Sequence, residues 1–147
     1  MIDKSEGGFL ISQVKQVGGR VFEKLLAEAG VGAFNGAQGR ILYVLWQVDN
    51  IPIVELARKT GLAKTTLTSM IDRMEESGLV TRIFDKCDRR QIRIALTDSA
   101  KKLSDEYERV SARMNKIYYA GFSDEEIIAF ENILRRILKN LHDEKIP

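Results

Sequence analysis

The sequence has one cysteine, one histidine and no long hydrophobic run. Because Cys87 has no partner in the chain, no internal disulfide can form, and we expect a reducing compartment, the cytoplasm. A single histidine with no HExxH or CxxC spacing gives no reason to expect a metal or another cofactor. No segment approaches the roughly 18 apolar residues of a membrane-spanning helix, and "MIDKSEGG" lacks the layout of a secretory signal. No nucleophile–base–orienter set is recognisable, so we do not expect an enzyme.

The charge of the chain is small in total but unevenly distributed. The formal net charge is +2, and 44% of the 147 residues are apolar, as in a folded protein. Residues 1–52 are neutral, residues 53–97 carry a net +3, and residues 98–147 carry a net −1. A polyanion is therefore expected to meet the middle third of the chain.

Three segments have the apolar spacing of amphipathic helices: 9–27, 103–117 and 127–141. "SDEE" at 123–126 predicts a capping box at the start of the last one. A further helix is expected at 37–48, where apolar residues again share one face. Long helices at both ends thus enclose a compact, basic middle.

Within that middle, "LARKTGLAKTTL" predicts a helix-turn-helix, with helices at 53–60 and 64–77. Gly61 would make the sharp turn, and the small Ala57 would let the second helix approach the first. The solvent face of the second helix has hydroxyls near its start and carboxylates later. A recognition helix enters the major groove with its N-terminal residues, so this gradient favours DNA binding over an ordinary helical hairpin, the alternative. The candidate major-groove contacts are Thr65, Thr68, Ser69 and Arg73.

Two β-rich runs follow, "LVTRIF" at 79–84 and "QIRIAL" at 91–96, and the second alternates apolar and polar residues. A hairpin directly after a recognition helix is a wing, and an arginine at its turn can enter the minor groove. We expect that arginine to be Arg90, held extended by a fork-like hydrogen bond that it donates to the Asp88 carboxylate. The candidate contacts with the DNA backbone are Lys64, Thr66, Arg82, Lys86, Arg89 and Arg93.

These features together resemble the MarR family of winged helix-turn-helix transcription regulators over nearly the whole chain. The family's wing pattern, Asp-x-Arg followed by Leu-Thr, appears as Asp88, Arg90, Leu96 and Thr97. The resemblance implies a homodimer that binds a pseudo-palindromic operator, with Arg90 in the minor groove and Asp88 as its support. The chain departs from the family at Ala63, where a capping side chain is common, and at Ser69, where many members have arginine.

A dimer is also expected from the residues themselves, because the terminal helices carry more apolar surface than a small winged domain can cover. Pairing across a two-fold axis would set two recognition helices about 34–36 Å apart, one turn of DNA. An internal bundle within a monomer is the alternative. We therefore assign 1–30 and 98–147 to a helical dimerisation region and 31–97 to a winged helix-turn-helix domain.

Two further sites are considered. The family often binds small aromatic or phenolic acids, and for such a pocket we single out Arg20, Arg40, Tyr43, Trp46 and Tyr107, each of which packing or surface exposure also explains. Cys87 lies at the wing tip, where oxidation would alter contact with DNA, although an incidental exposed thiol explains it too.

The sequence thus predicts a mainly α fold with a small β-hairpin wing. The expected function is a homodimeric, sequence-specific DNA-binding transcription regulator, a repressor that a small aromatic or phenolic ligand would release. Two alternatives stay open. One is a winged-helix protein-interaction module without specific DNA binding, and the other is a redox-responsive regulator acting through Cys87.

Overall fold

The computed structural model describes residues 2–88 and 90–144, and the chain divides into two compact units, Met1–Ala112 and Arg113–Pro147. The elements follow the order α1 (Gly7–Glu28), α2 (Gly36–Gln47), β1 (Ile51–Pro52), α3 (Ile53–Thr60), α4 (Lys64–Glu76), β2 (Val80–Phe84), β3 (Ile92–Leu96), α5 (Asp98–Lys101), α6 (Ser104–Tyr118) and α7 (Asp124–Asp143). Helix α6 begins in the first unit and ends in the second. The fold is mainly helical with one small sheet, as the sequence predicts.

The core of the first unit lies where α2, α3 and α4 meet the sheet. Its fully buried side chains are aliphatic and come from all of these elements: Ile41, Leu42, Leu45, Leu56, Leu67, Ile71, Met74, Val80 and Ile94. Burying each such side chain stabilises the fold by about 1.5–3 kcal/mol before entropy is counted. The helical spacing of Leu67, Ile71 and Met74 fixes which face of α4 is buried, and so leaves the opposite face exposed.

The sheet has three antiparallel strands in the order β1-β3-β2. Strands β2 and β3 pair from Val80 with Leu96 to Phe84 with Ile92, which confirms the predicted hairpin. Strand β1 was not predicted, because two residues are too few to show an alternating pattern. The predicted alternation along β3 is also incomplete, since Ala95 is buried together with its neighbours Ile94 and Leu96.

Local signals set the ends of the helices. Gly61 ends α3 in the left-handed region at φ 74°, and Gly78 follows α4 with φ 79°, as a residue without a side-chain carbon allows. The start of α2 is a capping box of Asn35 and Gln38, which was not predicted. Asn35 followed three residues later by a glutamine is the signal that would have found it.

The second unit contains the end of α6, a turn and α7. The predicted capping box of Ser123 and Glu126 is present at the start of α7. Before it, the Tyr119 ring contacts Phe122 and Phe130 edge-on at centroid separations of 6.2 and 6.3 Å, and its hydroxyl donates a hydrogen bond to Glu131. These contacts fix the turn between the two helices.

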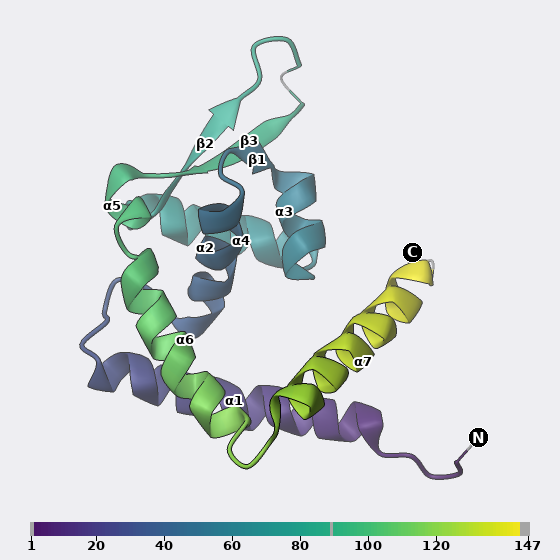
Figure 1. The fold of residues 1–147 in the computed structure, drawn as a ribbon. Helices are drawn as coiled ribbons and strands as arrows, with labels where there is room; N and C mark the ends of the chain where they lie inside the picture. The colour runs from purple at the N-terminus through teal and green to yellow at the C-terminus, as the bar shows by residue number, and fades with distance from the viewer. Residues whose placement is uncertain (1, 89, 145–147) are drawn as a thin grey trace. The chain divides into compact units, whose positions relative to one another are not determined.

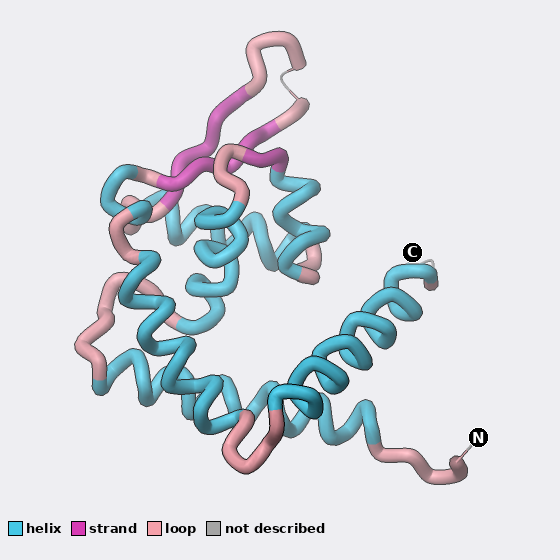
Figure 2. The backbone as a smooth tube through the Cα atoms, viewed as in Figure 1, coloured by secondary structure: helices cyan, strands magenta, loops and turns pink. Residues whose placement is uncertain are grey.

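Within the first unit, the β2–β3 hairpin projects beyond α2, α3 and α4 (Figure 1). The strands appear in magenta and the connecting turn in pink in Figure 2. Among the described residues, no helix is both long enough and apolar enough to cross a membrane. The hairpin with its turn, residues 80–96, is called the wing below.

Candidate nucleic-acid interface

Helix α4 presents the face that the sequence predicts. Thr65, Ser69 and Arg73 are exposed, while the apolar face packs inward. Thr68 differs, because its hydroxyl donates to the Lys64 carbonyl oxygen at 2.8 Å and its side chain is half-buried. Thr68 can therefore still accept a hydrogen bond from a partner, but its own hydrogen is engaged within the helix.

The first turn of α4 has no capping side chain. Ala63 stands at the N-cap and offers no acceptor, and the first turn contains Lys64 but no acidic residue. Backbone N–H groups at a helix start are unsatisfied without a cap and carry a partial positive charge. This end of α4 therefore favours a negatively charged partner.

The wing tip brings Asp88 and Arg90 together. One carboxylate oxygen of Asp88, Oδ1, accepts both the backbone N–H of Arg90 at 3.0 Å and its Nε at 3.3 Å. The contact is a single side-chain bond, not the fork predicted from the sequence. The Arg90 side chain remains 94% exposed, so its guanidinium is oriented and still available to a partner.

Asp85 also shapes the wing tip, and the sequence analysis missed it. Its Oδ1 accepts the backbone N–H groups of Cys87 at 2.8 Å and Asp88 at 3.4 Å. This is an Asx turn, for which an aspartate at the start of a loop is a recognised signal. Asp85 thereby sets the backbone that carries Asp88.

Arg82 is engaged within the chain. Its guanidinium pairs with Asp72 at 2.5 Å and with Glu75 at 2.8 Å, both on α4, and its side chain is only 17% exposed. Burial disfavours its charge, but the two carboxylates outweigh that effect and raise the pKa of Arg82. Both acids neutralise this arginine, so its guanidinium fixes β2 against α4, and the phosphate contact predicted for it stays a prediction.

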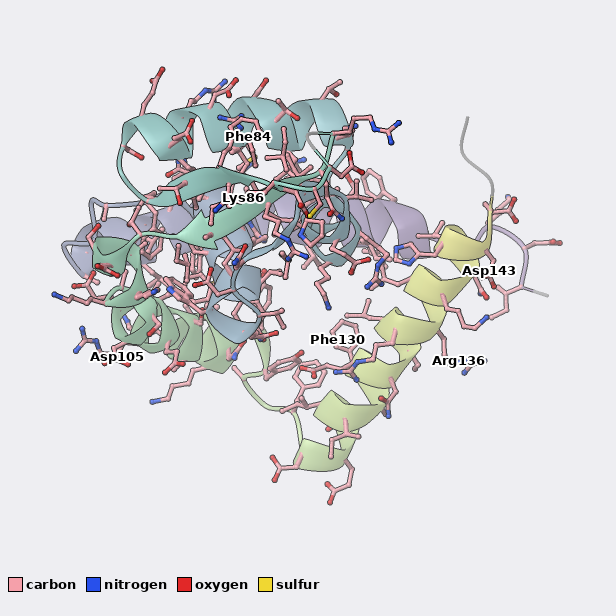
Figure 3. The ribbon with its side chains drawn as sticks, turned by 90° about the horizontal axis from the view of Figure 1, so that it is seen from above. Phe84, Lys86, Asp105, Phe130, Arg136 and Asp143 are labelled. Carbon is pink, nitrogen blue, oxygen red and sulfur yellow. The ribbon has the colours of Figure 1, made fainter. Side chains whose placement is uncertain are left out.

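The other predicted backbone contacts are placed differently. Arg93 donates from Nη1 to the Asn50 carbonyl oxygen at 2.8 Å, which holds the side chain without neutralising its charge. Lys86 and Thr66 are exposed. Figure 3 labels Lys86 in the turn of the wing and Phe84 at the end of β2. Arg89 lies outside the described residues.

Three of the five predicted pocket residues form part of one aromatic cluster. The Tyr107 ring lies 5.4 Å from that of Trp46 and 5.9 Å from that of Tyr43. Gly39 permits this approach, since a Cβ there would lie 2.9 Å from the Tyr107 ring. Trp46 also donates from Nε1 to the Ala100 carbonyl oxygen at 3.0 Å. These contacts favour packing for the aromatic residues.

The two arginines of that set are exposed. Arg40 donates from Nη1 to the Gly36 carbonyl oxygen at 3.3 Å. Arg40 and Tyr43 both line an open hollow of about 350 Å³ between α2 and α3, whose lining does not include Arg20, Trp46 or Tyr107.

Cys87 is exposed at the wing tip as a free thiol. Across residues 2–88 and 90–144, no group of three or more metal-ligating side chains comes together.

Comparison with known proteins places the chain among regulators. The family model described as "MarR family" matches residues 34–92. The HTH-type transcriptional regulator YsmB of Bacillus subtilis, described as uncharacterized, is 34% identical over 93 residues, which cover 63% of this chain and 64% of that protein. YfiV of the same organism, described in the same words, is 27% identical over 135 residues, covering 84% of each chain.

Solved structures agree with the fold. A MarR transcriptional regulator from Methanosarcina mazei Go1 superposes with a TM-score of 0.78 at 26% identity, covering 90% of this chain and 94% of that one. The structure of reduced AbfR bound to DNA superposes with a TM-score of 0.75 at 27% identity, covering 94% of this chain and 93% of that one. Both curated relatives are described as transcriptional regulators. The winged helix-turn-helix and the charged wing thus accompany a match to the MarR family over residues 34–92 and a fold similar to that of a MarR transcriptional regulator.

Proposed function

We propose that this protein is a homodimeric, sequence-specific DNA-binding transcription regulator that acts in the cytoplasm as a repressor. Helix α4 would enter the major groove with Thr65, Thr68 and Ser69 toward the bases. Arg90, supported by Asp88, would enter the minor groove. Lys64, Lys86, Arg89 and Arg93 would contact the sugar-phosphate backbone.

The observation that carries this proposal is the Asp88–Arg90 pair at the wing tip. The Arg90 side chain is 94% exposed, and Asp88 orients it by accepting hydrogen bonds from its Nε and its backbone N–H. The guanidinium is therefore pre-organised for a partner outside the chain. Narrow minor grooves concentrate negative potential and attract such a cation. The uncapped start of α4 adds a second, independent preference for an anion.

Dimerisation is supported by exposed apolar side chains in each unit. On α1, Phe9, Leu10, Val14 and Val17 are each more than half exposed. On α7 of the second unit no side chain of the described residues is buried, and Ile133, Leu138 and Leu141 are exposed. Apolar surface of this extent is costly in water, and a second copy of the chain would cover it.

A small aromatic or phenolic acid remains our proposal for the ligand that releases DNA. Support comes from the hollow between α2 and α3, where Tyr43 offers an aromatic face and Arg40 and Lys59 offer positive charge. Arg20, Trp46 and Tyr107 do not line this hollow, so they are left out of the proposed ligand site.

The test begins with selection of bound fragments from the genome of the source organism, using the wild-type chain. Arg90→Ala should lower the affinity for a selected fragment about tenfold or more. The variant should fold as well as the wild type and should still sediment as a dimer. Affinity should also fall steeply with salt, because several phosphates release counterions. Equal affinity of the two proteins at physiological salt would remove the wing from the interface. A flat salt response would instead favour the protein-interaction module.

A further inference from the structure

A hollow of about 410 Å³ lies between the start of α2 and the exposed side of α4. Its polar lining comes from both elements: Asn35, Gln38, Thr66, Ser69 and Arg73, with Met70 as an apolar member. No carboxylate lines the hollow, and Arg73 gives it a positive charge. The composition suits an oxyanion.

The capping box at the start of α2 determines what Gln38 offers to this hollow. The Gln38 Oε1 accepts the backbone N–H of Asn35 at 3.1 Å, and the Gln38 N–H donates to Asn35 Oδ1 at 2.8 Å. Because the amide oxygen is engaged, the amide nitrogen Nε2 is left as a donor of two hydrogens. No described residue accepts a hydrogen bond from it.

Arg73 is the charged member of the lining, and it differs from Arg82. Asp72 and Glu75 stand beside Arg73 in the sequence, yet both pair with Arg82. Among the described residues, no carboxylate lies within ion-pair distance of Arg73, which is exposed. The Arg82 bridge thus takes up the two nearest acids and leaves the positive charge of Arg73 for a partner outside the chain.

Helical spacing gathers the α4 donors toward one side. Thr66, Ser69 and Arg73 follow one another at intervals of three and four residues, so they occupy neighbouring rows of the helix. The hydroxyls of Thr66 and Ser69 are exposed and can each donate a hydrogen bond. Together with Gln38 Nε2 they surround the guanidinium with neutral donors.

We propose that this hollow seats a phosphodiester of the DNA backbone at the edge of the major groove. Arg73 supplies the charge and Gln38 Nε2 a hydrogen bond from a second helix. The inference rests on the proposed function and extends the interface to α2, which the sequence analysis did not include. It also moves Ser69 and Arg73 from the base contacts predicted for them to the DNA backbone.

Gln38→Glu is the most direct test, because it keeps the acceptor of the helix capping box and removes the hydrogen-bond donor Nε2. A glutamate at this position keeps the carboxyl oxygen that accepts the Asn35 N–H and adds a charge that favours the helix start. The midpoint of thermal unfolding should therefore be equal or higher. The same change replaces a donor by an anion inside the hollow, so affinity for the selected DNA fragment should fall about tenfold or more, uniformly across fragments.

Gln16→Glu is the matched control, since Gln16 is exposed on α1 and lies outside this hollow and outside the hollow between α2 and α3. It makes the same change of charge and should alter affinity less than about twofold. As a second variant, Arg73→Gln should lower the slope of log affinity against log salt by about one unit, as the loss of one phosphate contact does. The ratio of affinities of Arg73→Gln for different DNA fragments should equal that of the wild type.

The possible results separate this inference from the proposed function. Wild-type affinity for Gln38→Glu, on a fragment that Arg90→Ala binds weakly, would overturn the phosphate seat and leave the proposed function standing. Failure of the wild-type chain to select any fragment would overturn both. If inorganic phosphate raised the unfolding midpoint of the wild type but not of Gln38→Glu, while both bound DNA equally, the hollow would be a site for free phosphate and not for DNA.

Discussion

The bridge between the wing and α4 allows a prediction whose size follows from the structure. Arg82→Met keeps an unbranched apolar stem and removes the guanidinium that pairs with Asp72 and Glu75. The backbone N–H of residue 82 still donates to Glu75 Oε2, a bond of 3.1 Å that the change leaves intact. Only the side-chain part of the contact between β2 and α4 is lost.

The expected cost is about 1–2 kcal/mol of unfolding free energy. Hydrogen bonds to charged groups contribute about 1.5–3 kcal/mol when well sheltered, but Asp72 and Glu75 are 59% and 41% exposed, so solvent screening reduces each bond. For a chain of this size that loss lowers the unfolding midpoint by roughly 3–8 °C. Urea titration and calorimetry measure it directly.

Arg58→Met provides the control, because Arg58 also pairs with a glutamate at 2.8 Å but does so within α3, with both side chains well exposed. Such an exposed pair within one helix contributes little to stability, because solvent screens it. Equal costs for Arg82→Met and Arg58→Met would refute the assignment of a structural role to the bridge.

Two further changes test the fold around the site. Burial raises the pKa of Tyr107 above its usual 10.0, more than its bond from Ser111 and the charge of Arg40 lower it. Tyr107 therefore ionises at lower pH in the unfolded chain than in the folded one, so its contribution to the unfolding free energy is fully present below pH 10.0 and is lost as pH rises beyond it. Tyr107→Phe should make the loss of stability at alkaline pH less steep. A tyrosinate titration in which every tyrosine ionises at its usual pKa would contradict this prediction. Gly61→Ala should cost about 1–2 kcal/mol from the left-handed backbone alone, because a Cβ there meets no atom within 4 Å; no loss in a urea titration would show that the turn relaxes freely.

Much of the fold follows from short-range patterns. The bounds of α3 match the prediction, and α4 ends one residue earlier than expected. The wing strands start and end within a residue of the predicted runs. Elements of two to four residues, β1 and α5, were missed because periodicity needs a longer window.

The candidate site divides in the same way. Residue spacing and local charge are properties of the sequence. They predict that hydroxyls gather on one face of α4 and that cations gather at the turn of the wing. The closeness of Asp88 and Arg90 is also local, since two positions separate them. Asp85 and the capping box of Asn35 and Gln38 carry sequence signals that could have been used.

The sequence by itself determined where positive charge is concentrated and which face of each helix is apolar. Only the tertiary structure decided which cations are neutralised. Arg82 meets Asp72 across ten positions and Glu75 across seven, because the chain turns at Gly78 and β2 packs against α4. That contact leaves Arg73 without either acid and opposite Gln38 of α2. A charge acts through distance in space, and the fold, not the order of residues, sets that distance.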